Sequence, residues 1–194
     1  SFTKIVDDIL KDACEYLGIS AGALLRENQE QKTVDMICEY AGGGREPQMA
    51  KEQGVPKEEL PFFNGKPYMI SSDSMMPEGF ARLFAQKKLT AAVFLPVEVN
   101  GHAGMYLCFC ESEKKKKWEN ADVKFINDVK RIIQTILTKR ITKNSLASSY
   151  ASLEAILENV GCAIYVRDPQ TGHILYANEK YQKFFKKTLE ELPL

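Results

Sequence analysis

The sequence lacks the features that place a protein in a membrane or outside the cell. No apolar run approaches the roughly 20 residues of a membrane-spanning helix, and no signal-peptide pattern opens the chain. The 26 Lys and Arg residues balance the 26 Asp and Glu residues, so no net charge favours nucleic acid or an acidic membrane. We therefore expect a soluble cytoplasmic protein that neither binds nucleic acid nor inserts into a membrane.

Metal and thiol chemistry have little support in the sequence. The only two histidines, His102 and His173, have no second ligand at metal-binding spacing, and there is no CxxC motif. The five cysteines are odd in number and lie on apolar segments, which is typical of reduced, buried thiols. Cys108 and Cys110 share one face of a predicted strand, so a thiol-dependent enzyme stays an alternative to buried structural cysteines.

Apolar periodicity and turn residues predict an α+β fold with an antiparallel sheet flanked by helices. The expected helices span residues 2–17, 48–53 and 77–88, followed by a long helix that starts near residue 119. The expected strands span residues 21–26, 33–41, 67–71, 91–99 and 103–110. Asn100-Gly101 is a favoured two-residue hairpin turn, which would place Val99 opposite His102, Val97 opposite Gly104, Leu95 opposite Tyr106 and Val93 opposite Cys108.

The long helix carries an apolar heptad pattern. Glu119 is a suitable N-cap, and Trp118 can pack against Val123. The pattern turns polar at Arg140 and Lys143 and becomes apolar again further on, which is typical of a two-stranded coiled coil of limited stability. We therefore expect a homodimer formed through Ile126, Val129, Ile133, Ile136, Tyr150 and Leu157. The alternative is a helix that packs only on the sheet of its own domain. Lys114–Lys143 holds ten basic and three acidic residues, which we interpret as a solvated face.

Four segments, taken in order, give residues 1–140 a resemblance to a GAF domain. They are Gly65–Asp73 (GKPYMISSD), Ala91–Val97 (AAVFLPV), Gly104–Phe109 (GMYLCF) and Trp118–Asp122 (WENAD). The resemblance implies a sensory domain that binds a small molecule between its sheet and the excursion before the hairpin. The residues of that region that could line such a pocket are Phe62, Phe63, Tyr68, Asp73, Phe80, Phe84, Tyr106 and Cys108. No motif for cyclic nucleotides or for covalent bilin attachment is evident, so the resemblance implies no particular ligand or cofactor.

The end of the chain resembles the start of a PAS domain. The matching segments are Ile156–Asp168, Gly172–Asn178, Phe184–Phe185 and Leu189–Leu192, and Asn178 can cap the helix that follows it. Two strands cannot bury both faces of a sheet, so we expect a truncated domain. The expected organisation is therefore a GAF-like domain at 1–140, a helical linker at 141–155 and an incomplete PAS-like segment at 156–194.

This order of domains resembles the sensory half of bacterial signalling proteins, which precedes a histidine kinase or a GGDEF-type diguanylate cyclase. We expect non-catalytic sensing by this segment, relayed through a dimeric helix to an output domain that lies outside it. Two alternatives remain. One is a thiol-dependent reductase of the methionine sulfoxide type, as some GAF-fold proteins are, and the other is a ligand-free dimerisation module.

Overall fold

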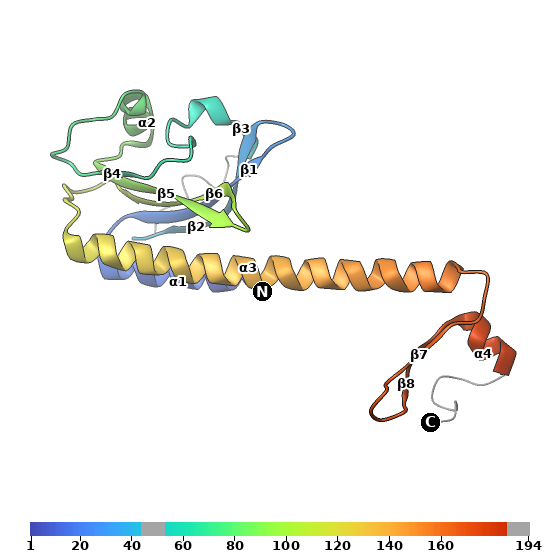
Figure 1. Ribbon diagram of the computed structural model, residues 1–194. Coiled ribbons are helices and arrows are strands. Elements are labelled where there is room, and N and C mark those ends of the chain that lie inside the picture. Colours follow the sequence, from blue (N-terminus) through green and yellow to red (C-terminus); the bar gives the residue numbers. More distant parts are fainter. Residues whose placement is uncertain (44–52, 186–194) are drawn as a thin grey trace. The chain divides into compact units, whose positions relative to one another are not determined.

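The computed structural model describes residues 1–43 and 53–185 (Figure 1). The chain divides into two compact units, Ser1–Thr138 and Lys139–Leu194. The boundary lies within one helix, α3 (Asn120–Asn159). The helix expected at 48–53 and the segment Leu189–Leu192 lie outside the described residues, apart from Gln53.

The first unit is built on one antiparallel sheet. Its strands are β1 (Ala21–Asn28), β2 (Thr33–Ala41), β3 (Val55–Pro56), β4 (Tyr68–Ile70), β5 (Ala91–Val99) and β6 (His102–Glu111). They lie in the order β3-β2-β1-β6-β5-β4. The helices are α1 (Phe2–Leu17), the 3-10 turn η1 (Lys57–Glu59), α2 (Phe80–Lys87) and the first half of α3. The expected α+β fold, with helices flanking an antiparallel sheet, is confirmed.

Helices cover both faces of this sheet. Figure 1 shows α1 and the first half of α3 on one face, and α2 with the segments around β4 on the other. Alternate residues of each strand therefore enter two separate cores. In β6, for example, Leu107 and Phe109 face α1 and α3, whereas Tyr106 and Cys108 face α2.

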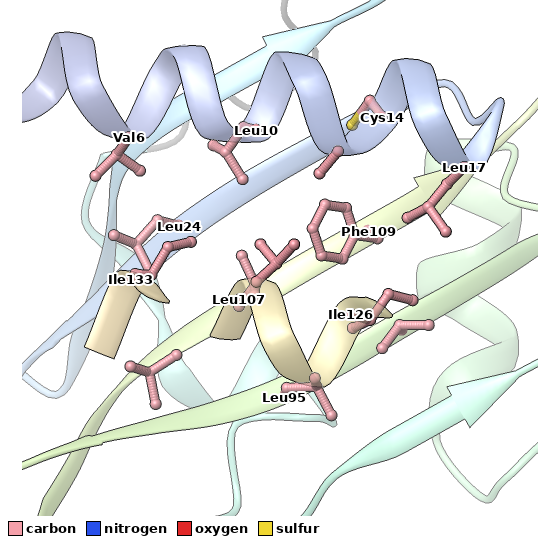
Figure 2. Packing of buried hydrophobic residues seen from close by; sticks show 14 of the residues in the cluster. Val6, Leu10, Cys14, Leu17, Leu24, Leu95, Leu107, Phe109, Ile126 and Ile133 are labelled. Carbon is pink, nitrogen blue, oxygen red and sulfur yellow. The ribbon is translucent and has the colours of Figure 1, made fainter. Parts of the chain in front are cut away.

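The α1/α3 face is closed by aliphatic packing. Figure 2 shows Val6, Leu10 and Leu17 of α1 above Leu107 and Phe109 of the sheet. Ile126 and Ile133, both fully buried, bring α3 onto the same surface. Gly22 lies beneath this layer, where an added Cβ would come within 3.0 Å of Cys14 Sγ and 3.1 Å of the Phe109 ring. This close approach explains why β1 has glycine there.

The hairpin of β5 and β6 has the predicted turn but not the predicted register. Asn100 and Gly101 both have positive φ, and Val99 lies opposite His102 as expected. An irregularity between Val97 and Val99 then shifts the pairing by one residue. Val97 pairs with Met105 rather than Gly104, Leu95 with Leu107 rather than Tyr106, and Val93 with Phe109 rather than Cys108. The shift places Leu95 in the core that faces α1 and α3 while Tyr106 stays in the other core.

Helix ends follow local sequence signals in two of three cases. Gly18 adopts φ 61° as the C-cap of α1, the position at which glycine is favoured. The amide of Glu119 donates to Asp122 Oδ2 at 3.1 Å, which is one half of the expected capping interaction at the start of α3. The prediction that α2 starts at Pro77 was wrong, because Gly79 with φ 84° is its N-cap and the helix begins at Phe80.

The second unit comprises the remainder of α3, the hairpin strands β7 (Tyr165–Arg167) and β8 (Ile174–Ala177), and α4 (Glu179–Phe185). Asn178 is its fully buried centre. Its Oδ1 accepts hydrogen bonds from the Ile164 and Tyr181 amides at 2.9 and 3.0 Å. Its Nδ2 donates to the carbonyls of Leu157 and Cys162 at 3.1 and 3.0 Å. One side chain therefore ties the end of α3 to the hairpin and to α4.

Candidate functional site

A small apolar cavity lies between the sheet of the first unit and α2. Its volume is about 40 Å³. The floor is formed by two cross-strand rows, of which the first pairs Glu39 with Ala23, Ala23 with Cys108, and Cys108 with Phe94. The second row pairs Ala41 with Ala21, and Ala21 with Cys110. The cavity exists because the β1 positions of both rows are alanines.

The remaining wall comes from α2 and the residues after it. Leu83 is buried, and Lys87 and Leu89 are half-buried. Ser20, Gly22 and Ser112 complete the lining. Glu39 of β2 and Lys87 of α2 are the charged members of the lining, and both are half-buried. The surface of the cavity is therefore almost entirely apolar, although two charged residues contribute to its lining.

Most residues expected to line a ligand pocket form a packed aromatic core instead. Phe62 stacks on Phe94 with ring centroids 4.1 Å apart, and Phe63 lies 4.4 Å from the Tyr106 ring. Phe62, Phe63, Phe80, Phe84 and Tyr106 are each at most 5% exposed, and none of them lines the cavity. Cys108 is the one expected residue that does. These rings fill the region in which the sequence predicted a ligand pocket.

The two other expected residues lie at the edge of this core. Tyr68 is half-buried, accepts a hydrogen bond from Asn64 Nδ2 at 2.6 Å and packs its ring 4.6 Å from that of Phe80. Asp73 is exposed in the loop between β4 and α2. Tyr106 is held in place because its phenol oxygen accepts from the Gly65 amide at 2.6 Å.

Sequence reasoning missed Glu39, Lys87, Ala23 and Ala41. The small residues Ala21 and Ala23, two apart on one strand, were the available signal, since alternate small side chains leave space on one face of a sheet. Lys87 follows Leu83 by four residues, which places both on the α2 face that meets the sheet. Glu39 had no comparable signal, because its position depends on the β1–β2 register.

The cavity thiols are poorly suited to nucleophilic chemistry. Burial, with a further contribution from Cys110, raises the pKa of Cys108 well above its ordinary value. Burial, followed by the nearby Glu39 carboxylate, raises the pKa of Cys110 to about 12. Thiols with such pKa values stay protonated at neutral pH and react slowly. Burial also lowers the pKa of Lys87, while Glu39 acts in the opposite direction.

A second feature, which we call the clasp, joins the end of β4 to the start of α3. It consists of Ile70, Ser71 and Ser72 on one side and Lys116 and Trp118 on the other. The Ser72 amide donates to the Lys116 carbonyl at 2.8 Å, and the Lys116 amide donates to Ser72 Oγ at 2.8 Å. The Trp118 amide donates to Ser71 Oγ at 3.1 Å, and its indole Nε1 donates to the Ile70 carbonyl at 3.0 Å.

The clasp continues into the first turn of α3. Lys116 Nζ lies 3.0 Å from Asp122 Oδ2 and 5.3 Å from the centroid of the Trp118 ring. Ile70 is also buried in the core beneath α2, where it packs with the aromatic rings. The clasp therefore connects the side of the sheet that carries the cavity to the helix on the opposite face.

The residues expected to form a dimer seam fall into two groups. Ile126, Val129 and Ile133 are at most 5% exposed and belong to the core of their own unit. In this chain they contact the sheet of their own unit and have almost no surface for a second copy. Ile136 and Leu157 are half-buried, and Tyr150 is 66% exposed.

Solved structures with the same fold include GAF domains of cyanobacterial photoreceptors. GAF3 of Slr1393 from Synechocystis sp. PCC6803 is 11% identical, with a TM-score of 0.62 over 75% of this chain and 99% of that one. The PixJ GAF domain of Thermosynechococcus elongatus is 12% identical, with a TM-score of 0.61 over 77% and 93%. The phycocyanobilin-bound GAF domain of a cyanobacterial phytochrome is 9% identical, with a TM-score of 0.61 over 72% and 85%.

These likenesses show that the chain contains the GAF fold. Comparison with protein-family profiles gives no match, and no curated protein matches the sequence. Within residues 1–43 and 53–185, no helix has the length and apolar character needed to cross a bilayer. The same residues contain no group of three or more His, Cys, Asp and Glu side chains suited to a metal ion.

Proposed function

We propose that the first unit is a non-catalytic sensory domain that binds a small molecule in the cavity beneath α2. The observation that supports this proposal is the cavity itself, which lies in an otherwise densely packed core and has an almost entirely apolar lining. The GAF fold is consistent with it, since the similar domain of a cyanobacterial phytochrome binds phycocyanobilin.

The cavity beneath α2 does not fit such a chromophore. A linear tetrapyrrole has dozens of atoms, whereas the cavity measures about 40 Å³ and stacked aromatic rings occupy the adjacent space. Each ring packs against its neighbours in the core, so a chromophore could enter only if these rings moved apart. We therefore propose a much smaller ligand.

The clasp supplies a route for a ligand signal in this proposal. Occupancy of the cavity displaces α2 and the aromatic core beneath it, and the core includes Ile70 at the end of β4. Ile70 and Ser71 accept the hydrogen bonds of Trp118, two residues before α3 begins. A change at the cavity is thereby transmitted to the start of α3.

A screen of metabolites by thermal shift, with tryptophan fluorescence as a second readout, tests the sensory role. The chain has one tryptophan, Trp118, so its fluorescence reports on the clasp alone. The matched variant is Ala41→Leu, which fills the cavity from a half-buried position. We expect a ligand that stabilises the native chain, changes Trp118 fluorescence and loses both effects in Ala41→Leu. A ligand that is equally effective on Ala41→Leu contradicts the assignment to the cavity.

We further propose that α3 forms a parallel homodimer that relays the signal to an output domain, such as a histidine kinase or a diguanylate cyclase, in a bacterial cytoplasmic protein. Leu146, Tyr150 and Leu153 support this, since they are 58%, 66% and 52% exposed. With Leu157 they follow spacings of four, three and four residues, which is a heptad seam. The dimer contacts are then made by this segment and not by the buried residues near the start of α3.

Sedimentation of charged variants tests the dimer. Leu146→Glu places a charge in the seam, whereas Ser148→Glu places the same charge two residues further on, on the opposite side of the helix, at a position that is also exposed. We expect the first variant to be monomeric and the second to remain dimeric. A native chain that is monomeric at all concentrations contradicts the relay and leaves the cavity proposal standing.

The domain organisation remains the one inferred from the sequence, with a GAF-like domain at 1–140, a linker at 141–155 and the start of a PAS-like domain at 156–194. The alternative of a thiol-dependent reductase is weakened by the raised pKa values of Cys14, Cys38, Cys108 and Cys110. The ligand-free dimerisation module is favoured if the screen finds no stabilising compound.

A further inference from the structure

The size of the cavity limits the molecule that it can enclose. An apolar cavity of about 150 Å³ holds a benzene molecule, which corresponds to about 25 Å³ for each carbon atom. The cavity beneath α2 measures about 40 Å³ and therefore has room for about two carbon atoms without movement of its walls. A longer ligand could enter only by displacing α2 or the sheet.

The surface of the cavity offers a ligand very few polar contacts. Its lining is almost entirely apolar, although Glu39 and Lys87 contribute to it. We infer that these two residues contribute mainly their methylene groups, since long charged side chains often cover apolar surface with their stems. The thiols in the lining are uncharged at neutral pH, because burial raises the pKa of Cys108 well above its ordinary value and that of Cys110 to about 12.

The two charged groups already have partners. Glu39 and Lys87 both interact with other groups of the folded chain. Burial lowers the pKa of Lys87, and the Glu39 carboxylate opposes this effect, so the two charges attract each other. A charged ligand would have to compete with this attraction and would also lose its own hydration, which costs free energy. A buried water molecule is also poorly accommodated, because it needs two to four polar partners.

We propose that the cavity binds a small, uncharged, apolar molecule of about two non-hydrogen atoms, enclosed by the alanines of the sheet and the stems of Glu39 and Lys87. This inference rests on the sensory role proposed above and names the chemical class of its ligand. Two independent restrictions give specificity. The volume excludes longer molecules, and the apolar lining disfavours polar molecules of the same size.

Three compounds of nearly equal size test the class. Ethane, methanol and methylammonium each have two non-hydrogen atoms, and they differ in polarity and charge. The readout is the NMR signals of the alanine methyl groups at Ala21, Ala23 and Ala41, which line the cavity. We expect ethane, dissolved under pressure, to shift these signals saturably and to bind at least about tenfold more tightly than methanol, whose hydroxyl would be buried without a partner. Methylammonium and the larger benzene are expected to leave the signals unchanged.

Two variants test the site. Ala41→Leu fills the cavity and is expected to abolish the ethane-induced shifts at Ala21 and Ala23. The matched variant combines Glu39→Gln with Lys87→Met, which removes both charges and keeps both stems. It is expected to bind ethane within about twofold of the native chain, because the stems and not the charges form the wall. Circular dichroism establishes that both variants are folded. Loss of ethane binding in the folded double variant overturns the role assigned to the stems.

The outcome also separates this inference from the proposed function. If methanol or methylammonium binds as tightly as ethane, or if ethane does not shift the alanine signals, the ligand class is wrong. The sensory role still stands in that case if another compound stabilises the native chain and loses its effect in Ala41→Leu. If ethane binds Ala41→Leu as tightly as the native chain, its site lies elsewhere and the inference fails.

Discussion

The clasp makes a local prediction that can be followed through in detail. Replacing Trp118 by Phe removes the indole N–H that donates to the Ile70 carbonyl at 3.0 Å and leaves a smaller ring in the same buried position. Ser71→Ala removes a different clasp bond, the acceptor of the Trp118 amide at 3.1 Å, and leaves the ring intact. The two variants therefore weaken the same junction by different routes.

The contacts set the size of the effect. Leaving the Ile70 carbonyl without its partner costs about 1–2 kcal/mol, and the smaller ring costs about 1 kcal/mol more through lost packing, because Trp118 is only 8% exposed. We therefore expect Trp118→Phe to lower the free energy of unfolding by about 2–3 kcal/mol. Ser71→Ala, which removes one hydrogen bond, is expected to lower it by about 1 kcal/mol.

Hydrogen exchange distinguishes a junction from general core packing. Both clasp variants are expected to speed exchange in the first turns of α3 and in residues 70–74, with a smaller effect in β1 and β2. The control is Ile133→Val, which also destabilises α3 packing by about 1 kcal/mol but lies away from the clasp. If the clasp variants and the control give the same exchange pattern across the first unit, Trp118 is only a core residue.

Three further predictions concern other parts of the chain. Glu111 is 2% exposed, and although burial would raise its pKa, hydrogen bonds from Ser20 and the amides of residues 112–114 hold that pKa below the ordinary 4.5. The ionised Glu111 carboxylate therefore stabilises the fold fully above about pH 4.5, and this stabilisation is lost as the pH falls through the lower pKa of the folded state. In urea unfolding, Glu111→Gln is expected to be less stable than the native chain by about 1.5–3 kcal/mol at pH 7, with a smaller difference near pH 3. Asn178→Ala removes four hydrogen bonds and is expected to make the β7–β8 hairpin sensitive to protease without changing the melting of the first unit. Peptide mapping after iodoacetamide should find exposed Cys162 modified first, with buried Cys14, Cys38 and Cys108 modified only after unfolding, and early labelling of Cys108 would contradict the packing described for the cavity floor.

The elements of the first unit could be predicted because their signals are local. Gly18 and Asn100-Gly101 mark their turns by residue type alone, and the apolar spacing of α1 identifies its buried face. The register of β5 and β6 could not be predicted from the turn. The irregularity next to Glu98 is a tertiary feature, since it places Leu95 and Val97 in the core that faces α1 and α3.

The site was harder to predict than the fold because the same residue types form ligand pockets and packed cores. Phe62, Phe80 and Tyr106 have the composition of a pocket wall, and only their mutual packing shows that they fill the space. The cavity depends instead on the small side chains of Ala21 and Ala23. The space that these small side chains leave can be recognised only when β2 and β6 are placed in register with β1.

The relation between α3 and its two sets of apolar residues indicates how a small ligand could have a large effect. Near its start, α3 buries Ile126, Val129 and Ile133 against the sheet, and its exposed Ile132 lies one residue away from that face. Further along the helix, Leu146 and Leu153 follow the exposed Ile132 by 14 and 21 residues, which are two and three heptads, and Tyr150 lies four residues after Leu146. Because both sets of residues belong to one continuous helix, we expect a rotation of α3 that loosened its packing on the sheet also to turn the seam and to break the hydrogen bonds of Trp118, two residues before α3 begins.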